Sequence, residues 1–208
     1  MSEVPVGVDG TRPPPSADGR AARRDRNRDA VLDAVIELFA EGNLDPDPDE
    51  VALRVGLSAR SVYRYFDDRD ALVRAAIDRN LERVFPLYLI HGIGEGGLDD
   101  RIDQFAAARL RLYEAIAATA RAARVRAAVD ELMAEQVEVT RRALREQVEK
   151  QFAPELDALE PRPRRAVSTA VDTLGQLESL DYYRVHQQFS LRETRTLLTD
   201  ALHALLDP

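Results

Sequence analysis

The sequence contains no cysteine, and only three of its 208 residues are histidine. Without cysteine the chain forms no disulfide, holds no metal through thiolates and offers no cysteine nucleophile. His91, His186 and His203 are scattered and show no metal-ligand spacing with acids or with each other. The chain also lacks a phosphate loop, a dinucleotide fingerprint and a nucleophile elbow. We therefore expect no metal, no cofactor and no enzymatic activity.

Long apolar runs are absent as well. No stretch approaches the length of a membrane span, and the first residues lack the charged start and apolar segment of a signal peptide. Hydrophobic residues make up 45% of the chain, which is enough for a buried core, so we expect a soluble cytoplasmic protein. The formal net charge is −8, so any contact with nucleic acid has to come from a local basic patch.

The N-terminal residues change character near position 20. Residues 1–19 are rich in Pro, Gly, Ser and Asp, a composition typical of a disordered tail. The most basic stretch of the chain follows, with Arg20, Arg23, Arg24, Arg26 and Arg28. Two interpretations of this stretch are open. It is either an arm that reaches DNA phosphates or the minor groove, or a charged run that only solvates the terminus.

Beyond the basic stretch, almost every segment has the apolar periodicity of an amphipathic helix. The glycines of residues 91–100 predict a loop that separates an N-terminal unit from a longer C-terminal one. No strand-like alternation is long enough to build a sheet, so the sequence predicts an all-α protein of about nine helices. The predicted helices span about 27–41, 47–55, 58–65, 68–86, 99–122, 130–152, 163–187 and 191–206, with a short helix in the arginine-rich turn after residue 122.

Residues 49–73 carry the most informative pattern. Two short helical segments are joined by a turn at Gly56, with Asp47 and Ser58 as N-caps and Pro48 in the first turn of the earlier helix. The residues predicted to pack inward are Val51, Ala52, Val55, Leu57, Val62 and Phe66. A glycine turn between two short packed helices predicts a helix-turn-helix.

The other face of the third predicted helix carries Ala59, Arg60, Ser61, Tyr63, Arg64 and Tyr65. Arginine, hydroxyl and tyrosine side chains suit the major groove, which accepts a helix and offers base acceptors, thymine methyls and phosphates. We predict that Arg60 reads a base and that Arg64 binds a base or a phosphate. Arg69 opposes the dipole of the fourth helix, and a DNA phosphate would explain its place there. The alternative is a packed helix pair whose Arg and Tyr side chains only cover the surface.

The segment 27–75 resembles the TetR family of bacterial regulators (TetR/AcrR type). In that family a first helix ends in Leu-Phe and Gly, and a helix-turn-helix ends in Tyr-x-Tyr/His-Phe and a basic residue. The residues in register are Leu38, Phe39, Gly42, Val51, Ala52, Gly56, Ser58, Val62, Tyr63, Tyr65, Phe66, Arg69 and Leu72. The resemblance implies DNA contacts by Ser58, Ala59, Arg60, Ser61, Tyr63, Arg64, Tyr65 and Arg69. We add Arg24 and Arg28 of the basic stretch as further candidates.

The C-terminal half is similar to the family more loosely, through its helical pattern and the ending HQQFSLRETRTLLTDALHALL. The resemblance implies that the last two helices pair in a homodimer, with Leu174, Leu177, Leu197, Leu198 and Leu205 as interface candidates. It also implies a small-molecule cavity, whose candidate lining is Phe105, Arg109, Tyr113, Met133, Gln136, Val137 and Gln176. Simple core packing is the alternative for each of these residues.

The resemblance implies three parts: a disordered tail (1–19), a helix-turn-helix DNA-binding domain with a basic arm (20–68), and a helical ligand-binding and dimerisation domain (69–208). The implied function is a transcriptional repressor that leaves a pseudo-palindromic operator when a small molecule binds. Two alternatives are a DNA-binding regulator without a small-molecule ligand and a helical protein that has lost DNA binding.

Overall fold

The computed structural model describes residues 17–207, with side chains from Ala21 onward, and this part of the chain is all-α without a strand. The prediction of an all-α protein is confirmed, with ten α-helices in the described range instead of about nine. They are α1 (Ala17–Ala40), α2 (Pro48–Arg54), α3 (Ala59–Tyr63), α4 (Arg69–Val84), α5 (Leu98–Ala127), α6 (Glu131–Gln151), α7 (Ala153–Asp157), α8 (Pro161–Gly175), α9 (Leu177–Asp181) and α10 (Leu191–Leu206). A 3-10 turn η1 (Phe85–Tyr88) follows α4, and a π-helical turn η2 (Tyr182–His186) follows α9.

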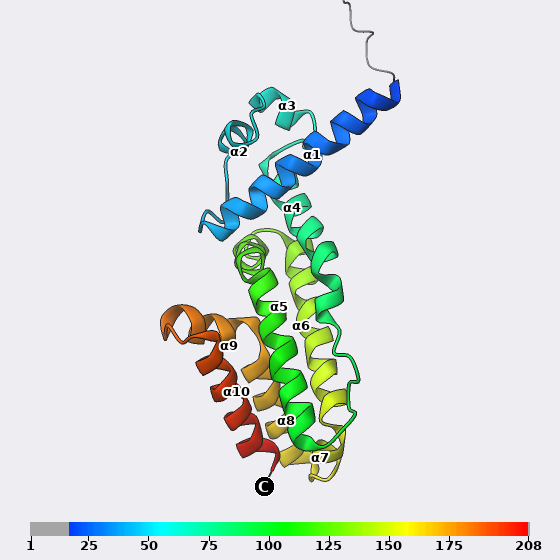
Figure 1. Ribbon diagram of the computed structural model, residues 1–208, viewed down its shortest axis with the longest axis vertical. Coiled ribbons are helices and arrows are strands. Elements are labelled where there is room, and N and C mark those ends of the chain that lie inside the picture. Colours follow the sequence, from blue (N-terminus) through cyan, green and yellow to red (C-terminus); the bar gives the residue numbers. More distant parts are fainter. Residues whose placement is uncertain (1–16, 208) are drawn as a thin grey trace, which may run out of the picture.

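The molecule is elongated, with α1, α2 and α3 at one end and the helices from α5 to α10 in the body that extends from them (Figure 1). Helix α4 leaves this end and runs into the body, where it packs on α5. In the body, α5 lies against α6 and α10, and α8 lies against the same two helices. None of the helices in residues 17–207 combines the length and the apolarity that crossing a bilayer requires.

Two hydrophobic cores stabilise the described part of the chain, one at the α1–α3 end and one in the body. One lies between α1, α2, α3 and α4, and includes Val35, Phe39 and Leu72. The other fills the body between α5, α6, α8 and α10. The C-terminal end of α5 belongs to the first core through Ala122 and Ala123, so α5 joins the two parts.

Helix α1 begins at Ala17, about ten residues before the predicted start at 27. Residues 17–19, predicted within the disordered tail, are therefore helical, while residues 1–16 lie outside the described part of the chain. The added turns lack an apolar face, but Ala and Arg favour helix. They extend a helix that is already anchored by the buried residues from Val31 onward, so no new nucleation is needed.

The predicted helix 163–187 is divided into α8 and α9. Gly175 ends α8 against α5, where a Cβ atom at this residue would stand 2.7 Å from Phe105 Cζ and 3.3 Å from Arg109 Nε. Gln176 then takes an extended conformation with ψ of 152°. Helix α8 therefore stops where glycine allows it to approach α5. Helix α10 has its predicted span and begins with a capping box.

Helix α5 is longer than predicted and runs to Ala127. The arginine-rich segment after residue 122, expected to form a turn with a short helix, continues α5 instead. Arg124 and Arg126 lie in its last turn, where cations interact favourably with the helix dipole.

Candidate nucleic-acid interface

Helices α2 and α3 form the predicted helix-turn-helix. At the start of α2, the Asp47 carboxylate accepts a hydrogen bond from the Asp49 N–H at 2.8 Å. At the start of α3, the Ser58 hydroxyl oxygen accepts one from the Ser61 N–H at 3.3 Å. Between them Gly56 has a φ of +66°, a left-handed conformation that costs glycine little. The caps and the turn residue expected from the sequence therefore define this unit.

The inward face of the helix-turn-helix also matches the prediction. Val51, Ala52, Val62 and Phe66 are buried, and Val55 and Leu57 pack against the same core. The Arg54 guanidinium at the end of α2 pairs with Glu41 after α1 at 2.6 Å. This face fills the core, and Arg60, Tyr63 and Arg64 on the opposite face take no part in it.

The outward face of α3 carries Arg60, Tyr63 and Arg64, all exposed, with Tyr63 at 51%. Within residues 21–207 the Arg60 side chain makes no hydrogen bond or ion pair. Helix α3 lies at the end of the molecule opposite the C-terminus (Figure 1). These three side chains are exposed to solvent, as contact with a nucleic-acid groove requires.

The other candidate residues of α3 are less open. Ala59, Ser61 and Tyr65 are half-buried. The Tyr65 ring lies edge-on to Phe66 with centroids 6.5 Å apart, and the Ser61 hydroxyl is 3.0 Å from that of Ser58. Helix α3 ends at Tyr63, two residues before its predicted end. Tyr65 therefore has a packing role beside any contact with a ligand.

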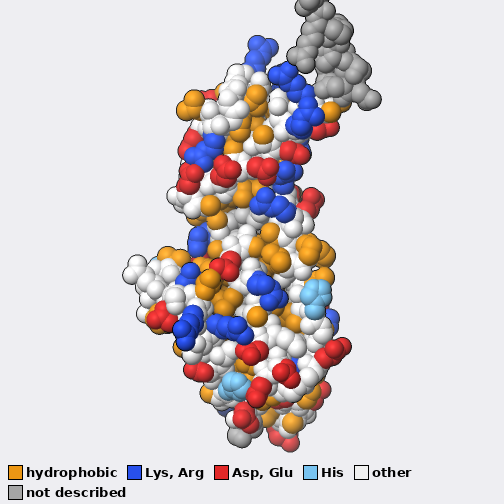
Figure 2. All heavy atoms as spheres, in the orientation of Figure 1, with side chains coloured by type: hydrophobic (Ala, Val, Ile, Leu, Met, Phe, Trp, Pro, Cys, Tyr) orange, Lys and Arg blue, Asp and Glu red, His pale blue; other side chains and the backbone are white. Residues whose placement is uncertain are grey.

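The N-terminal half of α1 lies beside the end of α3. A cleft at this end is lined by Arg23, Arg24, Asn27, Arg64 and Tyr65. Arginines from two elements far apart in sequence thus share one surface, which we call the basic cleft. Arginine side chains gather at this end of the molecule in Figure 2, and acidic side chains lie further along.

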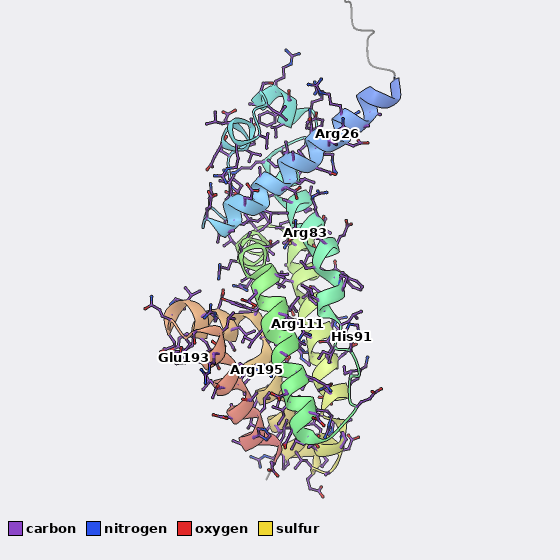
Figure 3. The ribbon with its side chains drawn as sticks, viewed as in Figure 1. Arg26, Arg83, His91, Arg111, Glu193 and Arg195 are labelled. Carbon is purple, nitrogen blue, oxygen red and sulfur yellow. The ribbon has the colours of Figure 1, made fainter. Side chains whose placement is uncertain are left out.

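Two other arginines of α1 lie near the basic cleft. The Arg28 guanidinium stacks over the Phe66 ring, 5.3 Å from its centroid, so Arg28 helps to hold α1 against the end of α3. Figure 3 labels Arg26 on the same half of α1. The side chain of Arg20 lies outside the described residues.

The structure gives Arg69 partners within the protein, and its contact with DNA stays a prediction. Its guanidinium donates to the Pro46 carbonyl at 3.1 Å and to the Asp45 carbonyl, and it pairs with the Asp45 carboxylate at 3.1 Å. The loop between α1 and α2 therefore explains why a cation stands in the first turn of α4. A DNA phosphate is not needed to account for it.

Further polar contacts join the helix-turn-helix unit to the body. Arg126 of α5 pairs with Asp45 at 2.8 Å and with Asp70 of α4 at 2.7 Å. Arg74 of α4 pairs with Asp130, the N-cap of α6, at 2.6 Å. The Met133 N–H and the Arg74 guanidinium hold the pKa of Asp130 below its ordinary value. These contacts, which we call the junction pairs, connect α4 to the two long helices of the body.

A cavity of about 50 Å³ lies in the body beside α4. Four of the seven predicted lining residues, Met133, Gln136, Val137 and Gln176, contribute to its wall. The sequence missed the lining residues Ile77 and Leu81 of α4, Tyr88 of η1, Ile116, Thr119, Ala120, Ala123 and Arg124 of α5, Thr140, Arg141 and Leu144 of α6, and Leu177 and Glu178 of α9. Helical spacing gave a signal, since 116, 119, 120 and 123 on α5 follow one face.

Phe105, Arg109 and Tyr113 do not line the cavity but pack in the core of the body, which corrects their prediction. The Arg109 guanidinium donates to Gln147 at 2.6 Å and to the Leu144 carbonyl at 2.9 Å. Burial lowers the pKa of Arg109 to about 10, although Asp172 opposes the shift. The Arg109 guanidinium also lies 4.5 Å from the Phe105 ring centroid, so these residues stabilise the contact of α5 with α6 and α8.

The leucines predicted for a dimer interface divide into two groups. Leu198 is 0% exposed and Leu177 is 8% exposed, because both pack in the core of their own protomer. They are not available to a partner, and the prediction is corrected for these two. Leu197 is 38% exposed, and Leu174 and Leu205 are half-buried.

Among residues 21–207, no three His, Asp or Glu side chains come together in a metal-binding arrangement.

Comparison with known proteins identifies the helix-turn-helix unit. Residues 31–76 match the family model of bacterial regulatory proteins, tetR family. No curated protein matches the chain significantly.

Several solved structures share the fold. A tetR-family transcriptional regulator from Streptomyces coelicolor has 20% sequence identity and a TM-score of 0.65 over 87% of this chain and 80% of its own. A TetR-family regulator from Rhodococcus sp. has 20% identity and a TM-score of 0.57, covering 88% of this chain and 99% of its own. A TetR/AcrR-family transcriptional regulator from Aquifex aeolicus has 18% identity and a TM-score of 0.58, covering 86% and 99%. Residues 31–76 are thus similar to the N-terminal domain of the tetR family of bacterial regulatory proteins, and the chain shares the fold of solved TetR-family transcriptional regulators.

Proposed function

We propose that the chain is a sequence-specific DNA-binding regulator of transcription. It acts as a homodimer on a pseudo-palindromic operator, represses from there in the cytoplasm, and is released by a small molecule. The observation that carries the proposal is the exposed Arg60, Tyr63 and Arg64 face of α3.

The surface around α3 supports DNA as its partner. The basic cleft adds Arg23 and Arg24 of α1 to Arg64 at the end of α3, the proposed recognition helix, so positive charge extends beyond this helix. In a protein with net charge −8, this local charge is what attracts phosphate. We assign base contacts to Arg60 and Tyr63, and phosphate contacts to the arginines of α1. Arg69 supports the site by fixing the loop between α1 and α2.

Helices α8 and α10 support the homodimer. The outer face of α8 carries small residues, Ala166, Thr169 and Ala170, which let a partner helix approach closely. The outer face of α10 carries Leu197. Charged residues flank both faces, Arg162 and Arg165 on α8, and Arg192, Glu193 and Asp200 on α10. A twofold axis that pairs these helices would set two recognition helices about one DNA turn apart.

The dimer is tested by Leu197→Glu, because a carboxylate in an apolar interface has no partner. We expect this variant to lower the mass measured by light scattering from that of a dimer to that of a monomer, and to weaken operator binding. The matched control is Leu132→Glu on α6, which replaces a leucine that is 64% exposed on another face. A dimeric mass for Leu197→Glu would place the interface elsewhere.

Helix α4 supports coupling between the cavity and the operator. Its C-terminal half lines the cavity through Ile77 and Leu81, and Gln136 of the cavity donates to Asp78 of α4 at 3.2 Å. Its N-terminus follows α3 after only five residues. A ligand that moves α4 would change the spacing of the two recognition helices and shift the population toward a dimer that cannot bind the operator.

The direct test is to recover the genomic DNA fragments that the full chain retains, and to measure binding to them by gel shift. We expect a short sequence with twofold symmetry, bound as a dimer, with affinity that falls steeply as salt increases. Retention of fragments without a common sequence, or of none at low salt, would favour a helical protein that has lost operator recognition.

A further inference from the structure

The cavity in the body has polar lining residues, but nearly all of them already have partners. Arg124 pairs with Asp181 at 2.7 Å, and Arg141 pairs with Glu178 at 2.6 Å. A charged ligand would have to break these ion pairs without offering a better carboxylate or guanidinium geometry. The cavity is therefore suited to a neutral molecule.

The uncharged polar residues of the wall are also engaged. The Asn80 amide donates to the Thr119 hydroxyl oxygen at 2.8 Å, and the Thr140 hydroxyl donates to the Gln136 carbonyl at 3.0 Å. The Gln176 amide donates to Asp172 at 2.6 Å. A ligand in this cavity thus meets a mainly apolar surface.

Tyr88 is the exception. It lines the cavity, and among the described residues its hydroxyl is the one buried side-chain polar group without a hydrogen-bond partner. Burial raises the pKa of Tyr88 to about 12, so the hydroxyl keeps its proton at neutral pH and is a donor. A buried hydroxyl without a partner is costly, and native proteins seldom leave one so unless something binds there.

We propose that the cavity binds a neutral, mainly apolar molecule with a single hydroxyl or carbonyl oxygen, and that the Tyr88 hydroxyl donates a hydrogen bond to this oxygen. The inference deepens the proposed function, in which a ligand releases the operator. Binding itself needs no DNA, so it is tested separately.

The position of Tyr88 links such a ligand to the operator. The residue lies on η1, directly after α4, and its backbone carbonyl accepts a hydrogen bond from Gln147 of α6 at 2.6 Å. The cavity of about 50 Å³ is smaller than the roughly 150 Å³ that holds benzene in an engineered protein cavity. A ring-sized ligand therefore has to push the walls apart, and the wall made by α4 is the one that continues toward α3.

The experiment compares two probes of the same ring size, phenol and toluene, titrated into the full-length protein and followed by NMR. Phenol and toluene differ in their affinity for water, so their dissociation constants differ even without a specific contact. The readout is therefore the change, from wild type to variant, in the ratio of the two dissociation constants. In Tyr88→Phe the phenol hydroxyl would be buried without a donor. We expect phenol binding to weaken by about tenfold relative to toluene binding in this variant.

Tyr113→Phe is the matched control, because the Tyr113 hydroxyl is also enclosed but donates to Asp181 at 2.8 Å and lies outside the cavity lining. It should lower the melting temperature and leave the phenol-to-toluene ratio unchanged. Tyr88→Phe should not lower the melting temperature, since it removes a hydroxyl without a partner.

Three results would overturn the inference: no binding of either probe at millimolar concentration, an unchanged ratio in Tyr88→Phe, or benzoate binding as tightly as phenol. A gel shift without any probe keeps the two proposals apart. Its failure in the wild-type protein would contradict DNA binding and leave the assignment of Tyr88 intact.

Discussion

Arginines occur in two regions around the helix-turn-helix, and their partners differ. Around α4, four arginines pair with aspartates: Arg69, Arg74, Arg126 and Arg79, the last of which pairs with Asp33 of α1 at 3.0 Å. At the outer end, the arginines form no ion pair within residues 21–207; these are Arg23, Arg24, Arg26, Arg60 and Arg64. Aspartates neutralise the positive charge of the first group within the protein. The second group leaves its positive charge unbalanced at the surface.

This contrast teaches how an acidic protein can offer a basic surface. A net charge of −8 is spread over the whole chain, but the field near a surface depends on the charges that remain unbalanced there. At the inner end of the helix-turn-helix, aspartates balance the charge of the arginines in the junction pairs. The outer end keeps its positive charge, which is where a phosphate backbone would be attracted.

The largest expected effect comes from removing a base-reading arginine of the outer region. Arg60→Ala should weaken operator binding by about 1–3 kcal/mol and relax the preference at one base pair, if the guanidinium makes a bidentate guanine contact. Binding to a panel of operators with single base changes measures this. Arg111→Ala, an exposed arginine of α5 labelled in Figure 3, is the control and should change nothing. A uniform loss over all sequences would assign Arg60 to a phosphate.

The next effect concerns the junction pairs. Arg126→Met keeps the aliphatic part of the side chain but loses the contacts with Asp45 and Asp70. We expect the free energy of unfolding to fall by about 1–2 kcal/mol, because the Arg126 guanidinium is largely buried whereas both aspartates stay hydrated. Urea unfolding measures this. The base preference should persist, and its loss at unchanged stability would contradict the separation of the two regions.

A smaller effect separates Arg24 from Arg69. Arg24→Ala should reduce the slope of log affinity against log salt by about one phosphate equivalent if the basic cleft holds the DNA backbone. Arg69→Ala should leave this slope unchanged and lower the melting temperature, because its partners are Asp45 and the Pro46 carbonyl. The opposite pattern would assign the phosphate contact to Arg69 and would mean that the arginines of α1 only solvate the N-terminal end of this helix.

Local signals were sufficient for the helix-turn-helix. The caps at Asp47 and Ser58, the turn at Gly56 and the apolar spacing all act within a few residues, so the sequence predicts the unit. Its outward face was predicted only in part, because Ala59 and Tyr65 pack against the core. The extension of α1 was missed because its added turns have helix propensity but no apolar pattern. The basic cleft was missed for another reason, since it depends on how α1 crosses α3.

The contacts of the body helices were less predictable, because these helices carry apolar residues on more than one side. Leu197 and Leu198 are adjacent in sequence, yet one is exposed and the other is in the core. Periodicity finds apolar faces but does not say which neighbour each face meets. The same limit applies to Tyr113, which looked like a cavity residue and in fact packs against Asp181. Tyr88 could not be found at all from spacing, since it lies on a 3-10 turn.

The smallest effect is the acid response of one junction pair. The Met133 N–H and Arg74 lower the pKa of Asp130, so its contribution to stability is present at neutral pH and is lost as the pH falls through the pKa of the folded state. In Asp130→Asn the amide oxygen can still cap α6, but nothing at this position titrates. We therefore expect the variant to melt at a lower temperature than wild type at neutral pH.

As the pH falls below the ordinary Asp pKa of 3.8 and through the lower pKa of the folded state, Asp130 of the wild-type protein loses its charge, so the difference in melting temperature should shrink. Melting curves at pH 7 and at about pH 3 measure this change. Asp67→Asn is the control, because Asp67 is exposed and makes no ion pair within the described residues. A constant difference between Asp130→Asn and wild type at both pH values would mean that Asp130 stabilises the junction without its charge, and the contrast between the two arginine regions would then not rest on ion pairing.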